Sequence, residues 1–136
     1  MRPLQHAALG RVLSALLVIA VLVGTLAPSL WFDNRAEALS WFRNADKWMH
    51  GLTFVVLAIW FAGLAERRSY WRVAVALLGF GLLIEGAQFL VGYRSADWLD
   101  MAANTAGIIA GFAAAIAGLG SWSLWVEDRY SRLRQR

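Results

Sequence analysis

The stretch at residues 73–111, VAVALLGFGLLIEGAQFLVGYRSADWLDMAANTAGIIAG, decides which fold this chain can adopt. It holds two apolar runs joined by a short polar link around Arg94 and Asp97. Each run is long enough to cross about 30 Å of hydrocarbon as an α-helix. Glu85 nevertheless lies six residues before the end of the first run, which is roughly 9 Å along a helix. A carboxylate at that depth is costly, so it indicates a functional site.

Two more apolar runs precede this stretch, and the four together occupy residues 12–30, 48–65, 73–91 and 98–119. Sixty per cent of the residues are hydrophobic and the mean hydropathy is +0.52, above what a soluble domain shows. We therefore expect one all-α domain over residues 1–136, a four-helix transmembrane bundle with a basic tail at residues 120–136. The first run is long for a signal peptide, and we expect it to be retained.

The distribution of lysine and arginine predicts the orientation of this bundle. With a cytoplasmic N-terminus, nine of these residues lie on the inner side and four on the outer side. The positive-inside rule then places both termini in the cytoplasm and the polar residues near the outer surface. Because the basic residues flank apolar runs, we expect no nucleic-acid partner. The absence of cysteine excludes disulfides and cysteine-ligated metals.

The segments outside the four runs carry their own patterns. Apolar residues at helical spacing in the loop at residues 31–47 predict a short interfacial helix on the outer leaflet. The tail mixes aromatic residues with four arginines, which predicts a segment held near anionic lipid. A tail that binds a partner is the alternative.

Small residues form a stripe along the fourth run at a spacing of four: Ala103, Gly107, Gly111 and Ala115. Such a stripe lets another helix approach closely. One interpretation is packing within the chain, with Gly79, Gly81 and Gly86 of the third run as the complement. The other is a homodimer, or a partner membrane protein, that contacts Gly107 and Gly111.

Polar residues of three runs are expected to meet at one depth, because short connections make the last three helices antiparallel. Glu85 and His50 are a candidate acid/base pair. Asp97 and Asp100 are candidate ligands of a divalent cation, which prefers oxygen donors. The candidate binding residues are Asp46, Lys47, Gln88, Arg94 and Asn104.

Each of these residues also has a purely structural interpretation. Asp97 can cap the fourth helix and Asp100 can favour its N-terminal dipole. Gln88 and Asn104 can form hydrogen bonds between helices. Arg94 can anchor the chain at the interface. No Ser-His-Asp spacing, HExxH, P-loop or GxGxxG motif is present, so the sequence leaves open whether any reaction is catalysed.

The chain resembles the VanZ-like family of small bacterial membrane proteins in three blocks: Asp46-Lys47-x-x-His50, Ile84-Glu85-x-x-Gln88, and Arg94-x-x-Asp97-x-x-Asp100-x-x-x-Asn104-x-x-Gly107. The resemblance implies a multi-pass protein of the bacterial cytoplasmic membrane. The family's namesake is associated with low-level resistance to teicoplanin, and relatives occur beside genes for envelope and polysaccharide work.

Two functions follow as hypotheses. In the first, an outer-leaflet pocket engages an envelope lipid or a lipid-linked glycan or phosphate. Lys47 and Arg94 would attract its anion. In the second, the polar residues only hold the helices in register, and the protein is an accessory or scaffold subunit. An ion or proton carrier is a weaker third hypothesis, because the inner half of the runs offers no matching polar group.

Overall fold

The computed structural model of the protein describes residues 7–31, 45–90 and 98–134, and this part of the chain is almost entirely helical. The expected interfacial helix in the first loop lies outside the described residues. The elements are α1 (Ala7–Trp31), α3 (Ala45–Leu64), the 3-10 turn η2 (Arg67–Ser69), α4 (Tyr70–Leu90), α5 (Trp98–Ile116), the 3-10 turn η3 (Leu119–Ser121) and α6 (Trp122–Arg134).

Four of these helices, α1, α3, α4 and α5, are long and apolar enough to cross a membrane. This confirms the prediction of a helical protein with four candidate membrane spans. The expected boundaries shift slightly: α1 begins at Ala7, and α5 ends at Ile116. Gly118 follows with a φ of 140°, a conformation that L side chains rarely adopt. The chain turns there before η3 and α6. The cytoplasmic position of both termini stays a prediction.

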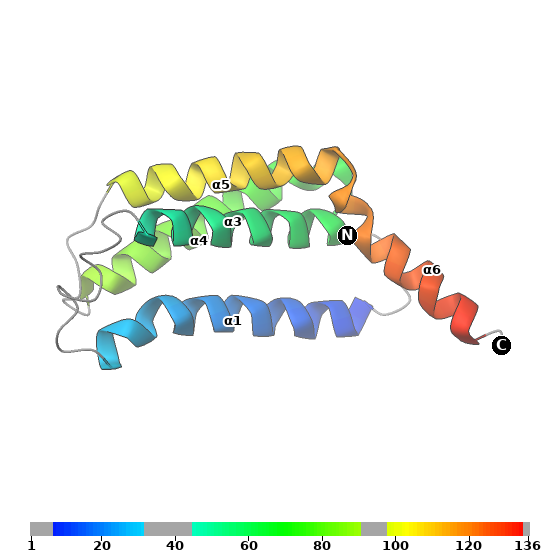
Figure 1. Ribbon diagram of the computed structural model, residues 1–136, viewed down its shortest axis with the longest axis horizontal. Helices are drawn as coiled ribbons and strands as arrows, with labels where there is room; N and C mark the ends of the chain where they lie inside the picture. Colours follow the sequence, from blue (N-terminus) through cyan, green and yellow to red (C-terminus); the bar gives the residue numbers. More distant parts are fainter. Residues whose placement is uncertain (1–6, 32–44, 91–97, 135–136) are drawn as a thin grey trace.

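The four long helices alternate in direction, so that α1 and α4 run one way while α3 and α5 run the other (Figure 1). The beginnings of α3 and α5 therefore lie at the same end of the bundle as the close of α4. This end is called the site end below. Helix α6 leaves the bundle at the opposite end.

The most extensive contact in the bundle joins α3 to α5. A Cβ atom on Gly107 would overlap the carbonyl oxygen of Gly51, and one on Gly111 would lie 2.6 Å from Cβ of Ala58. Glycine is therefore required at both positions for this close approach. The small-residue stripe of the fourth run is thus covered by α3 within one chain.

The predicted complement of that stripe was largely wrong. Within the described residues, a Cβ atom added to Gly79 or Gly86 of α4 would meet nothing within 4 Å beyond the local helix backbone, whereas one on Gly81 would lie 3.1 Å from the amide nitrogen of Asn104 in α5. Helical spacing identifies a face but does not fix which neighbour it meets. Because Gly107 and Gly111 are buried against α3, a dimer through them would require α3 to move aside, and such a dimer stays a prediction.

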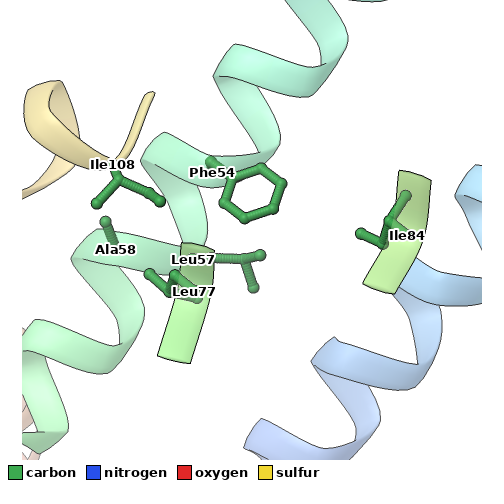
Figure 2. Packing of buried hydrophobic residues seen from close by; sticks show 6 residues of the cluster. All are labelled: Phe54, Leu57, Ala58, Leu77, Ile84 and Ile108. Atoms are coloured by element: carbon green, nitrogen blue, oxygen red, sulfur yellow. The ribbon is translucent and has the colours of Figure 1, made fainter. Parts of the chain in front are cut away.

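The apolar core lies where α3, α4 and α5 meet, and it is drawn in Figure 2. Close packing of this kind holds membrane helices together, because lipid chains are as apolar as the side chains themselves. Its members are Phe54, Leu57, Ala58, Leu77, Ile84 and Ile108.

Helix α6 is fastened to α3 at the end opposite the site end. The indole of Trp122 stacks on Trp60 with ring centroids 4.5 Å apart. Its Nε1 donates to the carbonyl oxygen of Ile59 at 3.3 Å, and the Ser123 hydroxyl donates to the carbonyl oxygen of Gly63 at 2.5 Å. The predicted tail therefore begins as a docked helix, and its side chains beyond Ser123 are mostly exposed.

Helix α1 is the outlying member of the bundle and makes fewer contacts than the other long helices. Two polar contacts tie it in. Trp60 Nε1 donates to the Ser14 hydroxyl at 2.9 Å, and Gln88 Nε2 donates to the carbonyl oxygen of Thr25 at 3.2 Å. Large apolar side chains along α1 are more than half exposed, among them Leu16 and Ile19. Such a surface suits contact with lipid.

Candidate functional site

Three helices bring polar side chains together at the site end of the bundle. Their side chains are buried although the surrounding residues are apolar. Asp100 and Asn104 have no exposed surface, and the other three are at most 6% exposed. Buried polar groups of this kind must be paired or hydrogen-bonded. The five residues, called the polar cluster below, are His50 from α3, Glu85 and Gln88 from α4, and Asp100 and Asn104 from α5.

His50 and Asn104 form a hydrogen bond between α3 and α5. His50 Nδ1 lies 3.2 Å from Asn104 Oδ1. The amide nitrogen of Asn104 points instead toward the sulfur of Met101, at 4.0 Å. An amide oxygen only accepts, so this contact is a hydrogen bond in the tautomer that carries its proton on Nδ1. In a neutral imidazole this places the lone pair on Nε2.

A second link between the same helices joins opposite charges. Lys47 Nζ lies 3.4 Å from Asp100 Oδ1, and the two side chains are 26% and 0% exposed. The lysine therefore stands at the rim, while the aspartate is fully enclosed. A carboxylate removed from water in this way needs such a partner.

The central relationship of the site involves His50, Glu85 and Asp100. One potential ligand atom from each, a ring nitrogen or a carboxylate oxygen, lies within 4.8 Å of those of the other two. These residues come from three different helices and from positions as far apart as 50 and 100. The spacing is that of donors able to surround one small ion or one polar group.

Gln88 lies one turn beyond Glu85, on the same face of α4. Its amide nitrogen reaches α1 through the Thr25 carbonyl. Its amide oxygen is buried and accepts no hydrogen bond within the described part of the chain. Sequence reasoning did not foresee Thr25 as a partner, because the contact uses a backbone carbonyl that carries no side-chain signal.

An apolar groove of about 230 Å³ lies between α1 and α3. The α3 residues that line it begin at Leu52, two positions after His50, so the groove starts at about the level of His50 along α3. Thr53 is the one polar residue of the lining. The lining residues are Leu17, Val21, Leu52, Thr53, Val56 and Leu57.

A family model described as VanZ/LLP1 matches residues 9–120. The chain belongs to this family. The match covers α1, α3, α4 and α5, so it includes every helix that contributes to the polar cluster. Neither the comparison with curated proteins nor that with solved structures found a match. Membership of the VanZ/LLP1 family, together with four apolar helices of spanning length, shows a multi-pass membrane protein.

The predicted site residues of this VanZ/LLP1 protein divide into two groups. His50, Glu85, Gln88, Asp100 and Asn104 come together in the structure, with Lys47 beside Asp100. The others are not placed: Arg94 and Asp97 lie outside the described residues, and Asp46 is in α3 with its side chain outside them.

The structure changes how the described residues group. The acid/base pair of Glu85 and His50 and the metal ligand Asp100 were predicted as separate sets. Instead Asp100 is fully buried and adjoins both. Helices α3 and α5 approach closely at Gly51 and Gly107, and Asp100 of α5 lies beside Lys47 and His50 of α3. Helical spacing alone does not reveal this arrangement.

Proposed function

We propose that this VanZ/LLP1 protein engages an envelope lipid, or a lipid-linked glycan or phosphate, whose head group enters the polar cluster from the outer side of the membrane. The observation that carries the proposal is the convergence of His50, Glu85 and Asp100 at buried positions of membrane-spanning helices. Ionisable residues at such positions are expensive and mark ligand sites more often than not.

The charges of the cluster narrow the head group. Carboxylates accept hydrogen bonds from sugar hydroxyls, so Glu85 and Asp100 suit a glycan. Lys47 stands at the rim, where its ammonium can meet a phosphate as a point charge. With His50 neutral, two carboxylates and one lysine leave a net charge of −1, which by itself opposes a phosphate. A phosphate therefore needs a proton or a cation in the cluster.

The groove between α1 and α3 supports a lipid as the bearer of that head group. Its lining is apolar apart from Thr53, and it begins within one turn of His50. Leu52 and Val56 on its α3 wall are at least half exposed. A hydrocarbon chain resting there would leave its polar end beside the cluster.

The second candidate function is a scaffold without a ligand. It is favoured by the contacts that cross between helices, His50 to Asn104, Lys47 to Asp100 and Gln88 to Thr25. Buried polar pairs can fix one helix arrangement among several. In that case the cluster would stabilise the bundle and nothing would enter it.

Retention of a lipid by the purified protein separates these functions. We expect native mass spectrometry of the full chain to show a long-chain prenyl phosphate bound at least about tenfold more tightly than the prenol of the same chain length. Glu85→Gln removes a carboxylate that would hold the proton or cation which the phosphate needs, so this preference should fall to near unity at unchanged folded yield. Glu66→Gln, a partly exposed glutamate paired with Arg68, is the matched control.

Three results would count against the proposal. Equal binding of prenyl phosphate and prenol by the wild-type chain removes the head-group site. If the Glu85→Gln chain is produced normally and still prefers prenyl phosphate over prenol, Glu85 is not part of the head-group site. Loss of folded yield in Glu85→Gln but not in Glu66→Gln supports the scaffold. Teicoplanin susceptibility of cells that carry the same variants tests the link to the phenotype of the family's namesake.

A further inference from the structure

We infer that His50, Glu85 and Asp100 form a binding site for a divalent transition-metal cation, one ligand from each of α3, α4 and α5. This inference rests on the proposed function, because it supplies the positive charge that a phosphate head group requires there. It also departs from the sequence-based expectation, which paired Asp100 with Asp97 as ligands and gave His50 and Glu85 to proton transfer.

The geometry fits a cation bound between the three side chains. Ligand atoms that surround a metal at about 2.0–2.2 Å lie no more than about twice that distance from one another. The three donor atoms here lie within 4.8 Å of one another, so each is at most about 2.8 Å from a common centre, and inward shifts of up to about 0.7 Å bring all of them to bonding distance. Their burial excludes competing water from most of the site.

The hydrogen bond from His50 to Asn104 supports the role of the imidazole. A metal-bound histidine usually donates its other ring N–H to an oxygen, which fixes the tautomer and the orientation of the ring. His50 Nδ1 lies 3.2 Å from Asn104 Oδ1, and a neutral imidazole that donates there has its lone pair on Nε2 for a metal. Asn104 is thus a positioning residue for the ligand.

Asp100, like His50, has one polar atom held by a neighbouring residue and another that can bind a metal. Gln88 adds a further polar atom near these ligands. Lys47 contacts Oδ1 of Asp100, and a carboxylate has a second oxygen with which it can bind a metal. Gln88 lies one turn from Glu85, and its buried amide oxygen accepts no hydrogen bond within the described residues. A water molecule bound to the cation would be a donor for it. This unsatisfied oxygen is an observation independent of the three ligands.

Charge and ligand type select the class of cation. Two carboxylates in a low-dielectric site repel each other, and a divalent cation neutralises both. With Lys47 the site then carries a charge of +1 and attracts a phosphate. One imidazole nitrogen with two carboxylate oxygens suits Zn²⁺ or Mn²⁺ better than Mg²⁺ or Ca²⁺, which favour oxygen ligands alone. Three protein ligands leave a position open for the head group.

The test uses Co²⁺ as a spectroscopic probe for the full chain in detergent. We expect the wild-type protein to bind one Co²⁺ per chain, with a visible d–d spectrum that Zn²⁺ abolishes by competition. Each of His50→Gln, Glu85→Gln and Asp100→Asn should weaken Co²⁺ binding by at least about tenfold. Asp128→Asn, an exposed aspartate of α6 paired with Arg132, should bind Co²⁺ as the wild type does.

The wild-type titration decides the question even if a variant does not fold. Absence of stoichiometric Co²⁺ binding by the folded wild-type chain overturns the inference, as does unchanged affinity in all three ligand variants. Prenyl phosphate binding with and without EDTA separates the two proposals. If prenyl phosphate still binds in the presence of EDTA, the proposed lipid site stands and the cation site is rejected. Stoichiometric Co²⁺ without any preference for prenyl phosphate over prenol retains the cation and rejects the lipid site.

Discussion

The imidazole of His50 and the side-chain amide of Asn104 are joined by a hydrogen bond of 3.2 Å between two closely packed helices, α3 and α5. Both side chains are buried, so each satisfies the other where water is excluded. The bond also sets the direction in which the histidine presents its remaining ring nitrogen. Stability and chemistry at this position therefore depend on the same contact.

Replacing Asn104 with alanine should destabilise the bundle and loosen the histidine. A hydrogen bond between membrane helices contributes about 1 kcal/mol, and we expect a loss of that size in the free energy of unfolding, measured by denaturation in mixed detergent. Thr105→Ala is the control, because the Thr105 hydroxyl bonds to the Met101 carbonyl of its own helix. A loss in Thr105→Ala equal to that in Asn104→Ala would contradict the role given to Asn104.

Replacing Gly107 with alanine should be more damaging than its small size suggests. The added methyl group would overlap the Gly51 carbonyl, which is backbone and can yield only if α3 and α5 separate. We expect a lower melting temperature by thermal denaturation and weaker Co²⁺ binding, because the ligands His50 and Asp100 belong to these two helices.

Gly86→Ala is the opposite case and serves as the matched comparison. Among the residues that the structure describes, the added methyl group meets nothing within 4 Å beyond the local helix backbone, and alanine is favoured over glycine inside a helix by about 0.5–1 kcal/mol. This change in α4 should raise the melting temperature slightly or leave it unaltered. If both alanine variants melt alike, the close approach of α3 and α5 is not what stabilises the bundle.

Replacing Lys47 with methionine should change the binding of anions and cations in opposite directions. The lysine lies 3.4 Å from an Asp100 oxygen, so its removal leaves the cluster more negative. Two unit charges at about 4 Å interact by about 4 kcal/mol at an effective dielectric of about 20, and the partial exposure of Lys47 reduces this. We expect Co²⁺ to bind about tenfold more tightly and prenyl phosphate to bind more weakly.

Arg68→Met controls for a general charge effect. Arg68 is exposed and pairs with Glu66, and it lies in η2, at the end of the bundle opposite the site end. It should alter neither affinity. A Lys47→Met chain in which both affinities move in the same direction would show that the lysine acts on the fold rather than on the charge of the cluster.

Replacing Gly63 with alanine should release α6 from the bundle. The methyl group would overlap the indole of Trp122, so the stacking on Trp60 would be lost. We expect faster proteolysis within residues 122–134 and a red shift in tryptophan emission, with Co²⁺ binding retained because the site lies at the other end. Gly79→Ala, with open space around the added group, should show neither change.

Four helices of spanning length and the gathering of polar residues at one end were predictable from the sequence. Run length and alternating direction determine those features, and both can be read from a single chain. The partner of each helix face was not predictable, because the rotation of a helix about its own axis is set by packing. For this reason Gly107 was assigned to α4 rather than to α3, and Asp100 was predicted as a ligand apart from His50 and Glu85.

The docking of α6 illustrates a different limit. The tail that contains Trp122 was expected near anionic lipid. The sequence position of Trp122 gives no hint of stacking on Trp60 or of filling the space beside Gly63. In such contacts a glycine in one helix leaves space for a large side chain of another helix. They can be identified only when the positions of both helices are known.

Because α3 and α5 pack closely together, two of the three proposed ligands, His50 and Asp100, belong to what is nearly a single rigid body. Glu85 belongs to α4, whose hold on that pair is much less extensive. A lipid wedged beside α4 would therefore alter the reach of Glu85 while the other two stayed where they are. In this arrangement the tightly packed pair of α3 and α5 carries the histidine and the aspartate, and the more loosely packed α4 carries the glutamate.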